Sequence, residues 1–169
     1  MADNTRLEIA RRQIETARQY TLGLIADLED ALWFRQPAEG ITHVAWQIGH
    51  LAVAEYGLGL FRLRGRGEGD GQLVSSSFRK QFGKGSQPDP DPNRNPSPAD
   101  LRQVLERVHQ QVLRELAGYT EADLDTPVEE PHALFATKLG CLYFCSLHEM
   151  MHAGQIGLVR RLLGKPPLR

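Results

Sequence analysis

The stretch LHEMMHAGQIGLVRRLLGKPP, residues 147–167, carries the strongest structural signal in this chain. It places His148 and His152 four residues apart within a helical pattern of apolar residues. Four residues of α-helix turn through about 400°, so both imidazoles project from one side of the helix, one turn apart. A helix uses this arrangement to give two nitrogen ligands to one metal ion. Gly164, followed by two prolines, marks the end of the helix.

A third histidine, His50, lies far upstream in another apolar helical stretch, IGHLAVAEYGLGLF. Three neutral imidazoles would leave coordination positions open, which is typical of catalytic rather than structural metal sites. The alternative is that all three are hydrogen-bonded core residues, as a lone histidine on an apolar helix face usually is. The spacing of His148 and His152 does not by itself decide between the two interpretations.

Residues 148–152 read HEMMH and therefore also match HExxH, the zincin signature. In that interpretation Glu149 is the general base and a third ligand follows downstream. The 17 residues after His152 contain no His, Asp or Glu, so His109 or His132 would have to supply the ligand from upstream. The sequence also shows no convincing strand to hold a peptide. We therefore expect Glu149 to point about 100° away from the ligands, at the surface or orienting an imidazole of another helix.

Apolar periodicity predicts four helices, over residues 4–35, 43–64, 98–118 and 133–163. The expected N-caps are Asn4 or Thr5 for the first helix, Thr42 for the second and Ser97 for the third, where Pro98 takes the first helical position. Four helices with one long connection predict an all-α four-helix bundle, whose core is a usual place for a metal site. With 169 residues, the whole chain is expected to form a single domain.

Residues 65–97 connect the second and third helices and are rich in Gly and Pro. A connection of this length is rarely idle in a compact domain. We expect it to shape access to the site rather than to form part of the core, with one short helix at Ser76–Phe82. Its apolar residues could pin it onto the bundle; they are Leu73, Val74, Phe78 and Phe82.

The composition argues against several classes of partner. Lys and Arg total 20 against 21 for Asp and Glu, which offers no field to attract nucleic acid or a membrane surface. The N-terminus is charged and lacks the apolar region of a secretory signal, and no run of 18 apolar residues occurs. Together with two cysteines on one helix, this predicts a cytoplasmic protein. The basic cluster Arg160, Arg161, Lys165 and Arg169 is interpreted as helix-dipole compensation and a solvated face, with a substrate carboxylate as the alternative partner of either Arg160 or Arg161.

Other polar residues near the histidines have weaker claims. Cys141 and Cys145 share the stripe of His148 and His152, so Cys145 could ligate a soft metal, but small core-filling residues are the favoured interpretation. His43 is interpreted as a helix cap or a residue of the substrate mouth. The remaining neighbours are Trp46, which could wall the pocket, Gly154, which would permit close helix approach, and Gln155, which could hydrogen-bond near the site.

The segments GHLA at 49–52 and H-x3-H-x-GQI-x3-RRLLGKPP at 148–167 together resemble the DinB-like superfamily. The resemblance spans most of the chain. It implies an up-down-down-up four-helix bundle with a long crossover between its second and third helices. It also implies that His50, His148 and His152 bind a divalent metal, often zinc or nickel. Relatives transfer or isomerise small molecules with a low-molecular-weight thiol such as bacillithiol or mycothiol.

The sequence thus predicts a metal-dependent enzyme acting on a small electrophilic substrate with a thiol, although no catalytic side chain is singled out. Two alternatives stay open: a hydrolase that uses metal-bound water, and a non-catalytic metal-binding or stress-associated interaction module, with or without its metal. A homodimer is compatible with the sequence.

Overall fold

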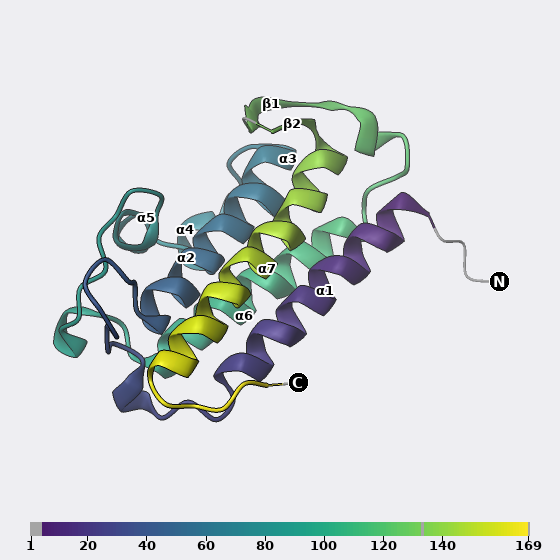
Figure 1. Cartoon of the computed structure of the whole chain (residues 1–169). Coiled ribbons are helices and arrows are strands. Elements are labelled where there is room, and N and C mark those ends of the chain that lie inside the picture. The colour runs from purple at the N-terminus through teal and green to yellow at the C-terminus, as the bar shows by residue number, and fades with distance from the viewer. Residues whose placement is uncertain (1–4, 133, 169) are drawn as a thin grey trace.

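The computed structural model describes residues 5–132 and 134–168, and these residues are mostly helical (Figure 1). The long helices are α1 (Arg6–Ile25), α2 (Val44–Tyr56), α6 (Pro98–Leu116) and α7 (Lys138–Leu162). A π-helical turn, η2 (Gly57–Phe61), and the short α3 (Arg62–Arg64) continue α2 without a break. The connection before α7 contains a 3-10 turn, η4 (Asp123–Asp125), and a small hairpin of β1 (Pro127–His132) and β2 (Phe135–Thr137).

The first helix ends ten residues earlier than the predicted range of 4–35, and only a 3-10 turn, η1 (Asp30–Leu32), follows it. The apolar pattern continues beyond Ile25 because the chain folds back over the bundle end and buries Trp33 completely. Arg160 from α7 fixes this end by donating to the Leu24 carbonyl at 2.6 Å and to Asp27 at 2.5 Å. This tertiary contact stabilises the observed end of the helix, which the periodicity of the helix itself does not reveal.

Side-chain caps define the starts of the helices. The hydroxyl of Thr5 accepts from the backbone N–H of Glu8, whereas the alternative cap Asn4 lies outside the described residues. Ser97 forms the predicted cap of α6, as part of a reciprocal capping box. Thr42 does not cap α2: the ring of His43 accepts from the backbone N–H of Trp46 instead.

The hairpin was not expected from the sequence. β1 and β2 pair antiparallel, with Pro127 opposite Thr137 and His132 opposite Phe135, and an irregular register between them. Most of β1 is exposed and only Val128 is buried, so the segment has no apolar alternation to mark it as a strand. The hairpin also delays α7, which begins at Lys138 with Thr137 as its N-cap; the predicted start, Ala133, lies outside the described residues.

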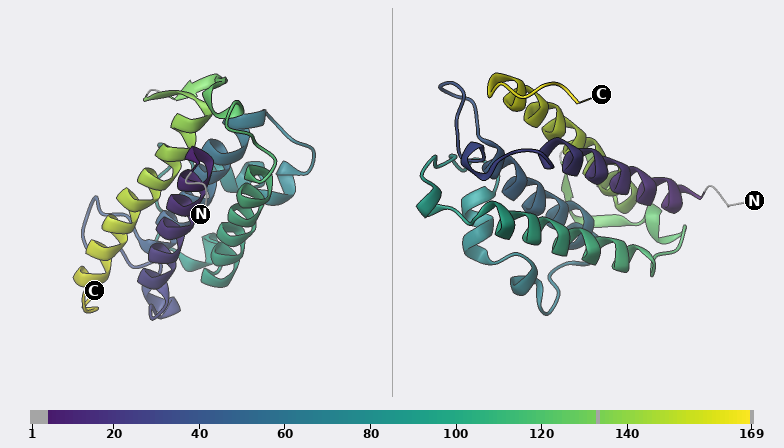
Figure 2. Two further views of the ribbon diagram at one scale, coloured as in Figure 1. Left: turned by 90° about the vertical axis from the view of Figure 1, so that its right-hand side faces the viewer. Right: turned by 90° about the horizontal axis from the view of Figure 1, so that it is seen from below.

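The views in Figures 1 and 2 show α1 lying along α7 and α2 lying along α6, with α7 also packed against α2. The contact between α2 and α7 brings the two helices that carry the candidate ligands face to face. The apolar core fills the space between the long helices and continues beneath the crossover. Within the described residues, no helix is both long enough and apolar enough to span a bilayer.

The crossover contains α4 (Asp70–Leu73), α5 (Ser76–Phe82) and the 3-10 turn η3 (Pro92–Arg94). The short helix predicted at Ser76–Phe82 is thus confirmed. The prediction that its apolar residues pin the crossover onto the bundle is confirmed, because Val74, Phe78 and Phe82 are buried members of the core and Leu73 packs against it. Three of the four apolar residues in this mostly polar segment therefore anchor the crossover to the core.

Candidate metal centre

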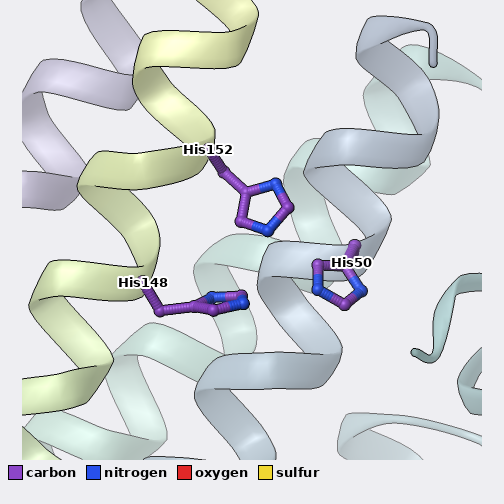
Figure 3. A group of neighbouring side chains, drawn as sticks. All are labelled: His50, His148 and His152. Atoms are coloured by element: carbon purple, nitrogen blue, oxygen red, sulfur yellow. The ribbon is translucent and has the colours of Figure 1, made fainter. Parts of the chain in front are cut away.

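Three histidine side chains converge between α2 and α7 (Figure 3). The ring centroid of His50 lies 5.3 Å from that of His148 and 4.8 Å from that of His152, and the latter two are 4.6 Å apart. One nitrogen from each ring lies within 4.8 Å of the other two, close enough for all three to face one ion. The helical spacing of the α7 pair and the packing of α2 against α7 together produce this arrangement. The structure therefore unites the three histidines singled out in the sequence.

Hydrogen bonds fix two of the three imidazoles. Nδ1–H of His50 donates to the backbone carbonyl of Phe82 at 2.8 Å, and Nδ1–H of His152 donates to the side-chain oxygen of Gln47. Since a carbonyl or amide oxygen can only accept, these partners assign the proton to Nδ1 and leave the Nε2 lone pair free. Metal-binding histidines are oriented in this way in proteins. Gln47 is itself held by Gln155, whose side-chain oxygen accepts from its amide at 2.8 Å.

The surroundings keep the three rings neutral. Burial, reinforced by the neighbouring histidines, lowers the pKa of His152 to about 3 and that of His148 to about 4. Burial also lowers the pKa of His50. Metal ligation requires the unprotonated imidazole, so a cluster that stays neutral well below pH 7 is prepared for a cation. The donor set thus fits a divalent transition metal, for which imidazole is a preferred ligand.

Gly49, the residue before His50, makes room for the crossover. A Cβ atom at this position would lie 2.5 Å from the ring of Phe82. The missing side chain lets Phe82 pack directly on α2, and the carbonyl of the same residue then reaches the His50 ring. The Gly-His pair is therefore explained physically: the glycine admits the residue that orients the histidine.

Trp46 and His43 occupy the same end of α2. The indole of Trp46 stacks on the His50 ring with centroids 4.7 Å apart and planes inclined by 6°, so it walls the site. Its Nε1–H donates to the hydroxyl of Ser86 in the crossover at 2.9 Å. His43 is fully buried, caps α2 through Nδ1, and donates through Nε2–H to the Asp89 carbonyl at 2.9 Å. The cap interpretation of His43 is confirmed, and the substrate-mouth alternative is wrong.

Glu149 faces away from the three histidines. Its two carboxylate oxygens accept from Arg18 at 2.8 and 3.1 Å, and it is buried with 3% of its surface exposed. Arg18 also binds Glu55 at 2.7 Å, and Glu55 in turn contacts the ring of His109 at 2.7 Å. Glu149 is therefore committed to an ion-pair network between α1, α2 and α6, and neither alternative offered for it, a surface residue or an imidazole partner, describes its contacts. The zincin interpretation loses both its general base and one of its upstream ligands.

The two cysteines are buried free thiols. Burial raises the pKa of both, and for Cys145 the nearby carboxylates of Glu55 and Glu149 raise it further. A thiol that is held neutral is a poor metal ligand, and the group of converging donor atoms found in the described chain consists of histidines alone. The core-filling interpretation of Cys141 and Cys145 is therefore the one that the structure favours.

The chain belongs to the DinB superfamily. The model of that family matches residues 13–156, which span the bundle from α1 to beyond the second α7 histidine. No curated protein matches the chain significantly.

A cavity of about 630 Å³ adjoins the histidines of this DinB protein. Small and apolar residues of α2 and η2 form one side of it, and the hairpin and α7 form the other. Its lining residues are His50, Val53, Ala54, Gly57, Leu58, Arg62, Lys84, Pro131, His132, Phe144 and His148. The volume suits a small molecule placed beside the candidate metal centre.

Two features of α7 differ from expectation. Arg160 is buried against Asp27 rather than solvated, whereas Arg161 is exposed as predicted. Gly154 is exposed with nothing of the described chain within 4 Å of the position of a Cβ, so it does not permit close approach of another described helix. Gln155 does act near the site, through Gln47.

Sequence reasoning missed several residues that build this DinB site. Gln47 lies three residues before His50 on the same helix face, and that spacing is a usable signal for a polar partner. The role of the Phe82 carbonyl could not be predicted from the sequence, because every residue carries a backbone carbonyl. Arg62 and Lys84 reach the cavity only through the π-helical turn and the crossover, neither of which the sequence pattern reveals.

Proposed function

We propose that this protein is a metal-dependent enzyme of the DinB superfamily that acts on a small electrophilic molecule, using a low-molecular-weight thiol. The observation that carries the proposal is a three-histidine centre that adjoins a cavity of about 630 Å³. A purely structural metal site is normally closed by four protein ligands. Here the described donor set ends at three, and the space beside it is large enough for a substrate.

His50, His148 and His152 would hold the ion, zinc or nickel. The bound ion supplies a Lewis acid, which lowers the pKa of a thiol or water in an open position. The protein residues supply orientation and shielding. Gln47 and the Phe82 carbonyl hold two rings with Nε2 free, and the Trp46 indole covers the His50 ring on one face. Glu149 is not available to accept the proton that a thiol would release, because its carboxylate is bound by Arg18.

Elemental analysis of the purified protein tests the metal. We expect close to one equivalent of a divalent metal in the wild type and background content when His148 and His152 are both replaced by Ala. A full equivalent in that double variant would refute the ligand assignment. The control is a change of His43, which lies on α2 outside the converging group, to Asn; it should keep the metal.

A screen of the metal-loaded protein with low-molecular-weight thiols and electrophilic substrates tests the reaction. Turnover that requires both thiol and metal supports the proposal. Metal-dependent hydrolysis without a thiol would support the hydrolase instead, and a full metal content with no turnover would favour a non-catalytic module.

Further expectations complete the proposal. We infer a single domain over residues 1–169, with the up-down-down-up helix order that the resemblance implies, acting in the cytoplasm on a small molecule without nucleic acid or membrane partners. A homodimer is supported by apolar side chains that α7 exposes, which are Leu147, Met150, Met151, Leu158 and Leu162. Light scattering of the purified protein tests the oligomeric state.

A further inference from the structure

Two cationic side chains face the cavity beside the histidines with no acid to balance them. Arg62 and Lys84 both line it, and no Asp or Glu of the described chain does so. The ion pairs formed by the described residues involve other cations. Acidic residues slightly outnumber basic ones in the whole chain, so an acid-free cavity with two cations is not a consequence of composition.

Arg62 is placed by the local distortion of its helix. It lies twelve residues after His50, which in an uninterrupted α-helix would put it about 120° around the axis. The π-helical turn Gly57–Phe61 directly before it turns less per residue and rotates it back toward the His50 face. Such π-helical turns are frequently found at functional sites. The distortion thus delivers a guanidinium to the cavity.

The hydrogen-bond donors of the Arg62 guanidinium are poorly satisfied within the described chain. Its Nη1 makes one long hydrogen bond to the Gly57 carbonyl at 3.4 Å, and its buried Nε has no partner in the described chain. Glu129 and Glu130 line a neighbouring cavity with Arg62, yet neither forms an ion pair with it. A buried donor without an acceptor costs free energy, and an external anion would relieve that cost.

Lys84 reaches the same space from the crossover, two residues after α5 ends. The charges of both cations are felt at His132 in the hairpin: after burial, Arg62 and then Lys84 contribute to lowering the pKa of that ring. Elements remote in the sequence therefore concentrate positive charge around one cavity. The three neutral imidazoles add no negative charge to offset it.

We propose that Arg62 and Lys84 form an anion-binding pair that selects a small molecule carrying a carboxylate, whose opposite end reaches the three-histidine centre. The planar guanidinium suits a carboxylate with two oxygens, and the ammonium adds a point charge. The carboxylate belongs either to the thiol or to the electrophile. The placement of the opposite end of this molecule at the three histidines rests on the proposed function. The binding of an anion by Arg62 and Lys84 does not.

Calorimetric titration of the full chain with succinate and with uncharged succinamide tests the pair, both as purified and after chelator treatment. We expect succinate to bind and succinamide to bind at least about tenfold more weakly, since charge-assisted hydrogen bonds of this kind are worth a factor of ten or more. The double variant Arg62→Gln with Lys84→Gln should lose this preference. The charge-matched control is Lys80→Gln with Arg161→Gln, because both are exposed and neither lines the cavity.

Cobalt-loaded protein identifies which reactant carries the carboxylate. Thiolate absorption is titrated with 3-mercaptopropionate and with neutral 2-mercaptoethanol. A preference for the acid that disappears in the Arg62 and Lys84 variant assigns the carboxylate to the thiol; equal binding of both thiols assigns it to the electrophile. If neither thiol binds, the proposed function fails while succinate binding still supports the pair. Equal binding of succinate and succinamide by the wild type, or an unchanged preference in the double variant, would overturn the inference.

Discussion

Replacing Gln47 by Leu should weaken metal binding without removing a metal ligand. Gln47 is fully buried, and its side-chain oxygen is the acceptor for Nδ1–H of His152. In the Leu variant the ring keeps no fixed tautomer or orientation, and a buried N–H loses its partner. Loss of such an outer hydrogen bond typically weakens metal affinity by about 10- to 100-fold. This corresponds to roughly 1.4–2.7 kcal/mol of binding free energy.

The protein contains its own reporter for this measurement. It has two tryptophans, and the indole of Trp46 stacks on His50 with centroids 4.7 Å apart. A paramagnetic ion such as Ni²⁺ bound beside His50 should quench Trp46, whereas Trp33 is buried at the bundle end and supplies a constant background. Titration of the fluorescence in competition with a chelator of known affinity then gives the dissociation constant for each variant.

Two further variants separate ring orientation from general damage. Gln155→Ala removes the residue that holds the far end of Gln47 and should weaken binding by less than about threefold, because the acceptor for His152 remains. Gln47→Glu keeps an acceptor at the same place and should bind metal at least as well as the wild type. The reasoning is refuted if folded Gln47→Leu protein binds Ni²⁺ within threefold of the wild type, or if Gln155→Ala is equally weakened.

Four other results are expected. In the metal-free protein the α7 histidines have folded-state pKa values of about 3 and about 4, below their ordinary 6.5, so their neutral burial favours folding fully above pH 6.5 and progressively less as pH falls toward 4 and 3. Urea unfolding between pH 7.5 and 4.5 should show this loss, and a variant with Asn at both positions should lose less stability over this range, with the remaining loss coming from other histidines of lowered pKa such as His50. Gly49→Ala should displace Phe82, cost about 1–3 kcal/mol in the free energy of unfolding and weaken metal binding, whereas Gly154→Ala on the open face of α7 should not destabilise the protein. Glu149→Gln should keep any activity within about tenfold, since a general base is worth about 10²–10⁴-fold, but should lower stability by about 3 kcal/mol in chemical denaturation because it breaks a buried ion pair. Replacing residues 83–95 by a Gly/Ser linker should preserve the helical circular dichroism and the metal while changing substrate preference; unfolding or metal loss would show that this segment is structural.

The sequence predicted what depends on local geometry. Histidines four apart on a helix share a face whatever surrounds them, so the α7 pair could be recognised in advance. The capping serine of α6 and the helix at 76–82 are local for the same reason. The predicted end of α1 was wrong because the observed end depends on a contact with Arg160 of α7, which is distant in the sequence. The hairpin was not predicted because most of β1 is exposed, so its sequence lacks the alternation of apolar residues that marks a strand.

The interior polar residues were harder to predict, because their roles depend on partners distant in the sequence. Arg18 and Glu149 are separated by 131 residues, and each alone has the composition of a surface residue. Only their pairing makes burial tolerable, since an isolated buried charge is costly. The histidine tautomers likewise depend on Gln47 and on a backbone carbonyl of the crossover. The identity of the candidate ligands was thus readable from the sequence, whereas their orientation was not.

The segregation of charge around α7 bears on which chemistry the site favours. One side of this helix carries Glu149, whose charge Arg18 neutralises within the core. The other side carries two neutral imidazoles that complete the centre with His50. Because the carboxylate is compensated elsewhere, a divalent ion held by the three histidines would keep its full positive charge. Such an ion attracts an anionic further ligand more strongly than one bound by carboxylates. A thiolate is such a ligand, so the donor set and the acid-free cavity favour the same class of reaction.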